Sequence, residues 1–359
     1  MTDLVGNLSR THAVVACELR QPGAPELRGV RVHELGRVAQ QIPVLPYPRV
    51  LRTLLAGVTV ATRAQVLHAH FGYFAPHVAR VAYHVRRPWV VSLHGHDLLV
   101  EGGSATDPDL VRAADLVIVP SRFLADAARR AGFPAERITV IPSGIDLKRY
   151  PFRPRRPAAD GRVIVSFVGR FVAKKGVLDA AEALVETVRR HPQVEARLVG
   201  FGPLEAEVRN RLDGCPVRLV DGSPDGAVAR ALQETDLLVT PSRTAPDGDA
   251  ESLGLVNVEA QASGIPVLST RHGGIPEAVG PGAGILVPEG EVLRIVQGLE
   301  SLLADPGRWP AMGEAGRRHV YEHFELHAQV AKVEERHLHL ARGRRNDRHP
   351  ATGLRRSDC

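Results

Sequence analysis

Short apolar segments alternate with longer amphipathic segments along most of the chain. Residues 89–93, 116–119 and 163–168 are apolar with little polar alternation, which is typical of strands buried on both faces of a sheet. Between such segments, apolar residues recur with the helical period, as in 121–131 and 177–190. This alternation predicts an α/β protein with parallel sheets that carry helices on both faces.

One segment interrupts the alternation. Residues 150–161 contain three prolines, show no apolar periodicity and end in Asp160-Gly161. Such a composition is typical of a linker between domains. We therefore expect two doubly wound domains, over 1–150 and 162–324, joined by a linker over 151–161. In sheets of this kind, ligands bind at the carboxyl ends of the strands.

Length and composition fit this division. A chain of 359 residues that is 44% hydrophobic is long enough for two folded domains. No apolar run approaches the ~18–20 residues that span a bilayer, and the first residues lack the basic and apolar regions of a signal peptide. The three cysteines are too few and too distant for a disulfide framework. These features predict a cytoplasmic protein.

The net charge of +6 is concentrated at one end. Residues 342–359 contain six arginines and two aspartates, which leaves about +2 for the rest of the chain. We expect this tail to be solvated and disordered; the alternative is weak attachment to an anionic membrane surface. Because no aromatic residues alternate with the basic ones, we do not expect a nucleic-acid partner.

The strongest chemical signal is a pair of glutamates, Glu251 and Glu259, eight residues apart. A helix over 255–263 is predicted here, with Gly264 as its stop. A helix N-terminus that follows a loop of small residues favours an anion, because its N–H groups and its dipole both attract negative charge. Carboxylates beside it suit the hydroxyls of a sugar or ribose. The alternative is two solvated acids around an ordinary helix start.

Two glycine-containing loops follow other predicted strands. Arg170 and Lys175 come after the strand that ends at Gly169, where cations could clamp a diphosphate. The alternative is a basic turn at a helix start, with Lys174 solvated. The second loop, Gly200-Phe-Gly202, is a weak signal and fits a turn without a ligand equally well.

Histidines end two more predicted strands. His68 and His70 form one His-x-His pair, and His94 and His96 form another. Two such pairs raise the possibility of a metal-dependent hydrolase. However, no later residues complete a metal-ligand pattern, and two open sheets differ from a single barrel. We therefore expect no metal, a structural role for His68 and His70, and a hydrogen bond from His94 to a bound hydroxyl or phosphate.

Together these segments resemble the GT4-type retaining glycosyltransferases, which have the GT-B fold. The matching segments occur in the family's order over 66–341 and are Leu93-His94-Gly-His-Asp97, Ile141-Pro-Ser-Gly144-Ile-Asp146, Gly169-Arg170…Lys175-Gly176, Gly200-Phe-Gly202-Pro-Leu, Thr240-Pro-Ser242, Glu251-x7-Glu259 and Gly273-Gly-Ile-Pro-Glu277. Within the family, the chain is similar to bacterial exopolysaccharide transferases of the colanic-acid type.

The resemblance implies two Rossmann-like domains that face each other across a cleft. Residues 1–150 would form the acceptor-side domain and 162–324 the nucleotide-sugar donor domain, with a terminal helix over 325–341 that crosses back to the first domain. Family members begin with a strand, a Gly-rich loop and a helix. Here residues 2–12 look like the end of that helix and 13–16 like the second strand. We therefore expect the first domain to lack its initial βα unit.

The resemblance also assigns a role to each candidate residue. By this resemblance, Arg170 and Lys175 hold the donor diphosphate, Glu251 binds hydroxyls of the transferred sugar, and Glu259 binds the ribose. His94 is expected near the sugar and the diphosphate. The remaining donor-binding positions are Gly169 and Gly202, which would line the donor pocket, and Ser252, Leu253, Gly254, Leu255 and Val256, whose backbone would face the phosphate.

The function that the resemblance implies is transfer of a hexose-type sugar from a nucleotide sugar to a glycan or lipid-linked acceptor, with retention, in cell-surface polysaccharide biosynthesis. We expect neither a metal nor a cofactor, and a location in the cytoplasm or at the inner face of the membrane. Two alternatives remain open. One is a catalytically impaired paralogue that binds a nucleotide sugar or a partner, and the other is a sugar-nucleotide epimerase of the same fold.

Overall fold

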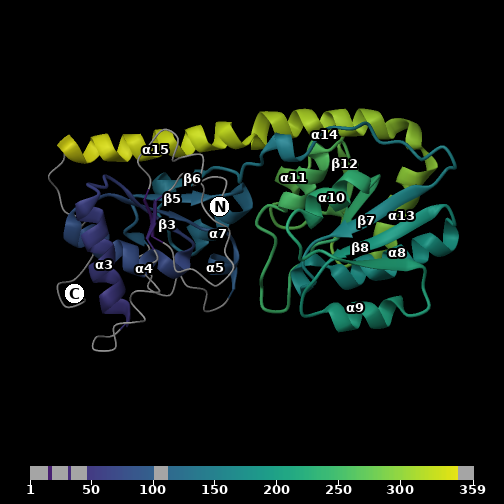
Figure 1. Cartoon of the computed structure of the whole chain (residues 1–359), viewed down its shortest axis with the longest axis horizontal. Helices are drawn as coiled ribbons and strands as arrows, with labels where there is room; N and C mark the ends of the chain where they lie inside the picture. The colour runs from purple at the N-terminus through teal and green to yellow at the C-terminus, as the bar shows by residue number, and fades with distance from the viewer. Residues whose placement is uncertain (1–14, 18–30, 34–46, 101–111, 347–359) are drawn as a thin grey trace. The chain divides into compact units, whose positions relative to one another are not determined.

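The computed structural model describes residues 15–17, 31–33, 47–100 and 112–346. The chain divides into two compact units, both drawn in Figure 1. The first unit takes the described residues up to Pro120, then Leu124–Gly144 and the helix that begins at Leu326. The second takes Ser121–Phe123 and Ile145–Glu325. Each unit is an α/β structure around a parallel sheet, which confirms the predicted fold class.

The first unit contains a four-stranded parallel sheet in the order β3-β4-β5-β6 and a separate parallel pair, β1-β2. Its described elements, in chain order, are β1 (Val15–Cys17), β2 (Arg31–His33), α3 (Tyr47–Ala61), β3 (Leu67–His70), η1 (Gly72–Phe74), α4 (Ala75–Val85), β4 (Trp89–Ser92), α5 (His96–Leu99), β5 (Leu116–Val119), α7 (Arg122–Arg130), η2 (Ala135–Arg137), β6 (Ile138–Val140) and α15 (Leu326–Asn346).

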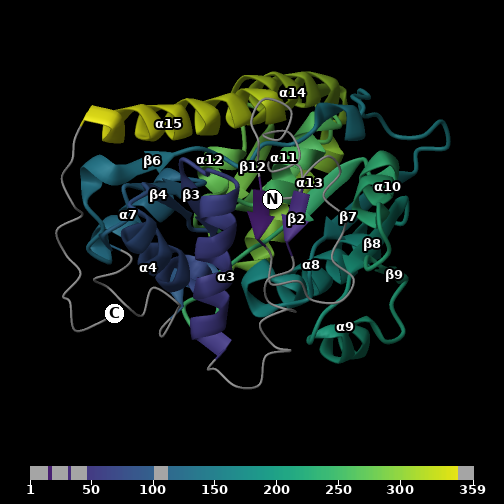
Figure 2. The same cartoon turned by 60° about the vertical axis from the view of Figure 1, so that its left-hand side comes forward.

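Alternate residues of these strands contribute to two separate hydrophobic cores. Val91 and Val117 belong to the core that α4 and α7 cover, whereas Val90 and Ile118 belong to the core that α15 covers. The period of two along a strand explains this division. Helix α15, yellow in Figures 1 and 2, therefore completes a sheet whose strands all lie more than 180 positions earlier in the sequence.

The second unit contains a six-stranded parallel sheet in the order β12-β11-β10-β7-β8-β9. Its elements, in chain order, are η3 (Leu147–Arg149), β7 (Val163–Val168), η4 (Ala173–Lys175), α8 (Val177–Arg190), β8 (Val194–Gly200), α9 (Glu205–Leu212), β9 (Val217–Asp221), α10 (Ala227–Glu234), β10 (Leu237–Thr240), α11 (Leu255–Ala262), β11 (Val267–Thr270), α12 (Ile275–Ala278), β12 (Gly284–Val287), α13 (Val292–Ala304), η5 (Pro306–Arg308) and α14 (Trp309–Phe324).

Helices cover both faces of this sheet, as the strand sequences predict. Leu237 and Val239 of β10 join the core beneath α8, α9 and α13, whereas Leu238 between them joins the core beneath α10, α11 and α14. All four residues of β10 and of β11 are buried. Burial on both faces is the reason that these strands are apolar without alternation.

The structure differs from the sequence predictions at the C-terminal end. Helices α14 and α15 are separated at Glu325, whose backbone is extended, and the terminal helix expected over 325–341 runs over Leu326–Asn346. Helix α15 reaches Asn346 and so includes the first five residues of the tail that we expected to be disordered. Two expectations fall on residues outside those that the structure describes. They are the disorder of the tail over 347–359 and the absence of an initial βα unit before residue 15, and both stay predictions.

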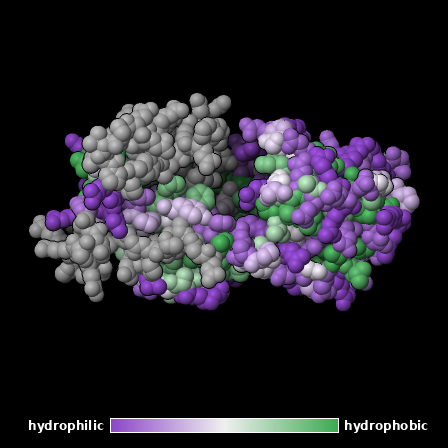
Figure 3. Space-filling view, turned by 90° about the horizontal axis from the view of Figure 1, so that it is seen from below, coloured by the Kyte–Doolittle hydropathy of each residue, from purple (hydrophilic) through white to green (hydrophobic). Residues whose placement is uncertain are grey.

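None of the helices in the described part of the chain is both long and apolar enough to span a bilayer. On the face shown in Figure 3, hydrophobic residues of the second unit occur in small groups among hydrophilic ones. The large hydrophobic side chains that are exposed lie on separate elements, as Val60, Phe201, Leu293 and Tyr321 illustrate.

Replacing Leu326 with alanine should destabilise the first unit, because its side chain is 4% exposed in the core between α15 and the sheet. A buried Leu→Ala change costs about 2–5 kcal/mol. The chain has two tryptophans, Trp89 in the first unit and Trp309 in the second, so urea unfolding followed by fluorescence in a Trp309→Phe background reports on the first unit. Leu338→Ala on the same helix, at 39% exposure, is the matched control. Equal losses in both variants would contradict the packing described.

Candidate active site

The predicted donor-binding residues of the second unit all follow the carboxyl ends of strands. Gly169–Lys175 follow β7, Gly202 follows β8, and the segment from Glu251 to Glu259 follows β10. Strands β7 and β10 are neighbours, but the helices after them, α8 and α11, cover opposite faces of the sheet. The loops after β7 and β10 therefore start side by side and lead to opposite faces of the sheet. In open α/β sheets, such a switch point is where ligands bind.

Glycines allow the loops at this edge to touch backbone to backbone. A Cβ atom at Gly176, where φ is +61°, would lie 1.8 Å from the carbonyl oxygen of Pro241 in the loop after β10. A Cβ atom at Gly200 would lie 1.9 Å from the carbonyl oxygen of Gly169. Side chains are thereby excluded at both positions. The close approach brings Lys175 of one loop to Glu251 of the other.

Two lysine–carboxylate ion pairs join these loops. Lys175 Nζ contacts Glu251 Oε2, and Lys174 Nζ lies 2.9 Å from Asp249 Oδ2. The four side chains are only 11–19% exposed. Lys174 is therefore paired and largely buried, which differs from the alternative in which it was solvated. Burial raises the pKa of Glu251, but the charges of the two lysines outweigh it and hold that pKa below its usual value.

Helix α11 begins at Leu255, the position that the sequence predicts. Gly254 caps it with φ at +82°, a conformation that glycine adopts without strain. A Cβ atom there would meet the side chain of Asn257 at 2.9 Å. The first backbone N–H groups of an α-helix have no acceptor within the helix. The segment Ser252–Val256 therefore places hydrogen-bond donors beside the Lys175–Glu251 pair.

Glu259 lies on the next turn of α11 and has a partner that the sequence did not indicate. Tyr150 donates a hydrogen bond from its hydroxyl to Glu259 Oε1 at 2.7 Å. Burial raises the pKa of Glu259, and the Tyr150 hydrogen bond offsets part of that effect. The hydrogen bond occupies one oxygen of the carboxylate and leaves the second for another donor.

Ser121–Phe123 is a segment from the first half of the sequence that belongs to the second unit. Ser121 Oγ donates to the carbonyl oxygen of Ser252 at 2.6 Å. The backbone N–H groups of Arg122 and Phe123 donate to the carboxylate of Glu277 at 2.8 and 3.0 Å. Ser252 and Glu277, each from a different sequence motif, thus hold residues 121–123 by hydrogen bonds.

Two further predicted site residues, Arg170 and His94, lie after strands of different units. Arg170 is exposed just after β7. His94 belongs to the first unit, at the carboxyl end of β4. Buried Asp97 accepts hydrogen bonds from the backbone of His94 and Gly95 at 2.9 Å, and from that of Gly72 at 2.8 Å. The Asp97 side chain therefore fixes the turn that carries His94.

His68, His70 and His94 form a cluster with His337 of α15. His68 Nε2 lies 2.8 Å from Ser92 Oγ, and His337 Nε2 lies 3.1 Å from His68 Nδ1. Among the described residues, His70 Nδ1 and His94 Nε2 have no hydrogen-bond partner. Within the same residues, no three His, Cys, Asp or Glu side chains are placed to hold one metal ion.

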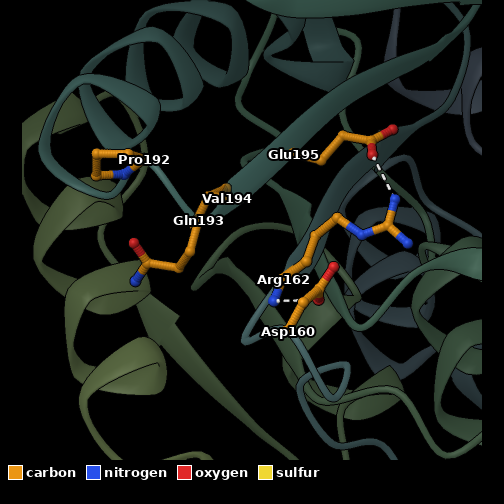
Figure 4. A pocket seen from close by; sticks show the side chains of 6 residues that line it. All are labelled: Asp160, Arg162, Pro192, Gln193, Val194 and Glu195. Atoms are coloured by element: carbon orange, nitrogen blue, oxygen red, sulfur yellow. Dashed lines mark hydrogen bonds and ion pairs between the residues drawn. The ribbon is translucent and has the colours of Figure 1, made fainter.

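A pocket of about 210 Å³ lies at the other edge of the second unit's sheet. Figure 4 shows Arg162, just before β7, reaching toward Glu195 at the start of β8. Since the chemical motifs follow the carboxyl ends of the strands, this pocket at their amino ends contains none of the predicted site residues.

Sequence profiles of two protein families match this chain. The family described as "Glycosyl transferases group 1" matches residues 149–319, and "Glycosyltransferase Family 4" matches residues 1–149. The two matches together cover both predicted domains.

Individual glycosyltransferases are also similar in sequence to most of this chain. WcaL of Escherichia coli K12, named for colanic acid biosynthesis, is 31% identical over 70% of this chain and 64% of its own length. A mannosyltransferase of Mycolicibacterium smegmatis, named as GDP-mannose-dependent and acting on phosphatidylinositol monomannoside, is 30% identical over 96% of this chain and 94% of its own.

The fold has solved counterparts. The crystal structure of Anabaena HepE in complex with UDP-glucose has a TM-score of 0.75 and 19% identity to this chain, over 93% of both chains. At that identity the likeness shows the fold alone.

Acidification should destabilise the first unit through His70. Burial, followed by the neighbouring His94, lowers the pKa of His70 to about 3, whereas an unfolded histidine titrates near 6.5. Below pH 6.5 the unfolded chain therefore binds a proton that the folded unit does not. His70 should account for a loss of about 2 kcal/mol between pH 6.5 and pH 5.

The measurement is urea unfolding at both pH values, followed through Trp89 in the Trp309→Phe background. His70→Asn should show a smaller loss on acidification than the parent protein, and the exposed-residue control His84→Asn should match the parent. An unchanged loss in His70→Asn would contradict this assignment.

Proposed function

The chain belongs to glycosyltransferase family 4, whose members have the GT-B fold, and from this premise we propose that it transfers a hexose-type sugar from a nucleotide-sugar donor with retention of configuration. The acceptor is a glycan or a lipid-linked glycan of cell-surface polysaccharide biosynthesis. Support for the acceptor class comes from relatives named for colanic acid and for phosphatidylinositol mannoside synthesis.

The observation that carries the proposal is the position of Lys175 and Glu251. The two groups meet at the switch point of the sheet, beside the N-terminus of α11. A cation and free N–H groups suit a diphosphate, and a carboxylate suits the hydroxyls of a sugar attached to it. These few residues can therefore bind both the diphosphate and the sugar of a nucleotide sugar.

In the proposed mechanism, these groups act on the leaving group. Glycosyl transfer forms an oxocarbenium-like centre while negative charge grows on the departing diphosphate. Lys175, Arg170 and the amides of Ser252–Val256 would stabilise that charge, which lowers the barrier because the donors are fixed beforehand. The acceptor attacks from the face that the diphosphate leaves, and the diphosphate oxygen takes its proton.

The remaining residues orient the donor. Glu251 binds hydroxyls of the transferred sugar, and Glu259, held by Tyr150, binds the ribose with its second oxygen. Gly169 and Gly202 would line the donor pocket. A Cβ atom at Gly202 would lie 2.6 Å from the carbonyl oxygen of Phe171, so no side chain fits at that position. His94 acts on the sugar or the diphosphate. The reaction in this scheme uses neither a protein nucleophile nor a metal.

We also propose that the enzyme works in the cytoplasm, in peripheral contact with an anionic membrane surface. A lipid-linked acceptor would place the reaction there, and the arginines of 342–359 would favour the contact.

The proposal is tested by incubating the purified chain with a panel of UDP-sugars and GDP-sugars and measuring nucleoside diphosphate release and donor affinity. One donor should bind and be hydrolysed slowly without an acceptor. A chain that binds one donor without releasing diphosphate, with or without lipid-linked glycans from the source membrane, would be an impaired paralogue. A chain that binds none would contradict the proposal.

Lys175→Ala should weaken binding of the donor about 10- to 100-fold, since one charge-assisted hydrogen bond to the diphosphate is lost. Isothermal titration with the nucleoside diphosphate measures the change. Lys148→Ala, at an exposed lysine of the same unit, is the control. Because the single change leaves Glu251 unpaired, Lys175→Ala/Glu251→Ala is measured as well; full recovery of affinity in the double variant would contradict a direct role of Lys175.

Glu251→Ala should reduce sugar transfer by about 100-fold or more while affinity for the nucleoside diphosphate changes by less than about fivefold. The reason is that the carboxylate is assigned to the sugar, which the free diphosphate lacks. Transfer rate and diphosphate affinity are measured on one preparation. Parallel loss of both would assign Glu251 to the diphosphate site instead.

A further inference from the structure

We propose that His272 is a positioning residue that holds the backbone of Glu251 for sugar transfer, and that it does so as the neutral imidazole protonated on Nδ1. The inference rests on the proposed function, because it concerns how Glu251 is placed. His272 follows β11 and is 5% exposed.

Both ring nitrogens of His272 are engaged. The backbone N–H of Glu251 donates to His272 Nε2 at 3.1 Å. On the other side of the ring, Nδ1 lies 2.6 Å from Glu289 Oε2. A ring nitrogen that accepts a hydrogen bond carries no proton. In the neutral ring, the proton therefore lies on Nδ1 and is donated to Glu289.

The residues after His272 hold the carbonyl group of the same residue, Glu251. The backbone N–H of Gly274 donates to the carbonyl oxygen of Glu251 at 2.9 Å. A Cβ atom at Gly273 would lie 2.1 Å from that oxygen, so no side chain fits there. His272 and Gly274 thus hold the N–H and the C=O of Glu251, while Lys175 holds its carboxylate.

Glu289 ties this arrangement to the loop after β10. Its carboxylate accepts a hydrogen bond from the backbone N–H of Thr244 at 2.9 Å, and Thr244 Oγ1 lies 3.3 Å from Oε1. Glu289 is 41% exposed, so its own energetic contribution is modest. The role of Glu289 is to select the tautomer of His272. Because the carboxylate of Glu289 accepts a hydrogen bond from Nδ1, the proton stays on Nδ1, and Nε2 can accept the hydrogen bond from Glu251.

The charged groups that face His272 are the carboxylates of Glu289 and Glu251 and the ammonium group of Lys174. Burial lowers the pKa of His272, and the two carboxylates offset only part of that effect. A second proton would place Nε2–H against the N–H of Glu251, two donors facing each other. Transfer activity should therefore fall as pH falls through the pKa of His272, below about 6.5.

The kinetic test uses two substitutions at this position. His272→Ala should lower kcat about 10- to 100-fold with the donor KM changed less than about threefold, because the sugar-binding carboxylate is displaced. His272→Gln offers an amide oxygen that accepts from Glu251 and does not titrate. It should keep kcat within about fivefold of the parent at pH 8 and lose the decline at acid pH.

His191→Gln, at a histidine after α8 that is remote from these contacts, is the matched control and should keep the decline. Persistence of the full acid decline in His272→Gln, or a stable His272→Ala with unchanged kcat, would overturn the inference.

A second measurement needs no turnover. The ¹⁵N shifts of the His272 ring at pH 7.5 should show a protonated Nδ1 and an unprotonated Nε2, and the Glu251 amide should exchange about tenfold or more faster in His272→Ala than in His191→Gln. The opposite tautomer, or unchanged exchange, would overturn the inference even if the enzyme is active. Absence of any donor binding or turnover, with this tautomer and exchange as expected, would instead remove the proposed function.

Discussion

The second unit is organised around the neutralisation of buried carboxylates where the loops after β7 and β10 meet. A buried carboxylate is strongly unfavourable unless a cation accompanies it. Lys175 and Lys174 supply the cations for Glu251 and Asp249. Both pairs require loops that approach within backbone contact, which is why Gly176 follows Lys175 directly. The charge that a donor diphosphate would use is thus the charge that stabilises the ligand-free site, and donor binding must compete with Glu251 for Lys175.

Much of this arrangement could be predicted from the sequence, because its signals are local. Apolar runs located the strands of both sheets, and the Glu251–Glu259 spacing with Gly254 located the start of α11. Partners far apart in the sequence could not be predicted. Tyr150 reaches Glu259 across 109 positions, and no pattern near Tyr150 indicates it. Asp249 had one weak signal, its place two residues before Glu251, yet nothing local showed that it would pair with Lys174.

The first unit shows the same limit. His94 was recognised from its motif, and the structure adds the means by which its turn is held, the three backbone hydrogen bonds to Asp97. The terminal helix was expected from residue 325 and begins at Leu326, but no sequence pattern shows why α14 ends just before it. Glu325 is extended because its backbone forms a bridge with Ile145, a tertiary contact that periodicity does not reveal.

The position of helix α15 in the sequence also decides when the first unit can complete its core during translation. The face of the first unit's sheet that carries Val90 and Ile118 is covered by Leu326 and Val330, which leave the ribosome only after the second unit. Because chains fold from the N-terminus as they emerge, the first unit spends the translation of the whole second unit with that apolar face uncovered. At about 5–20 residues per second, this exposure lasts some tens of seconds. The nascent first domain is thus a natural client for chaperones until its final helix arrives.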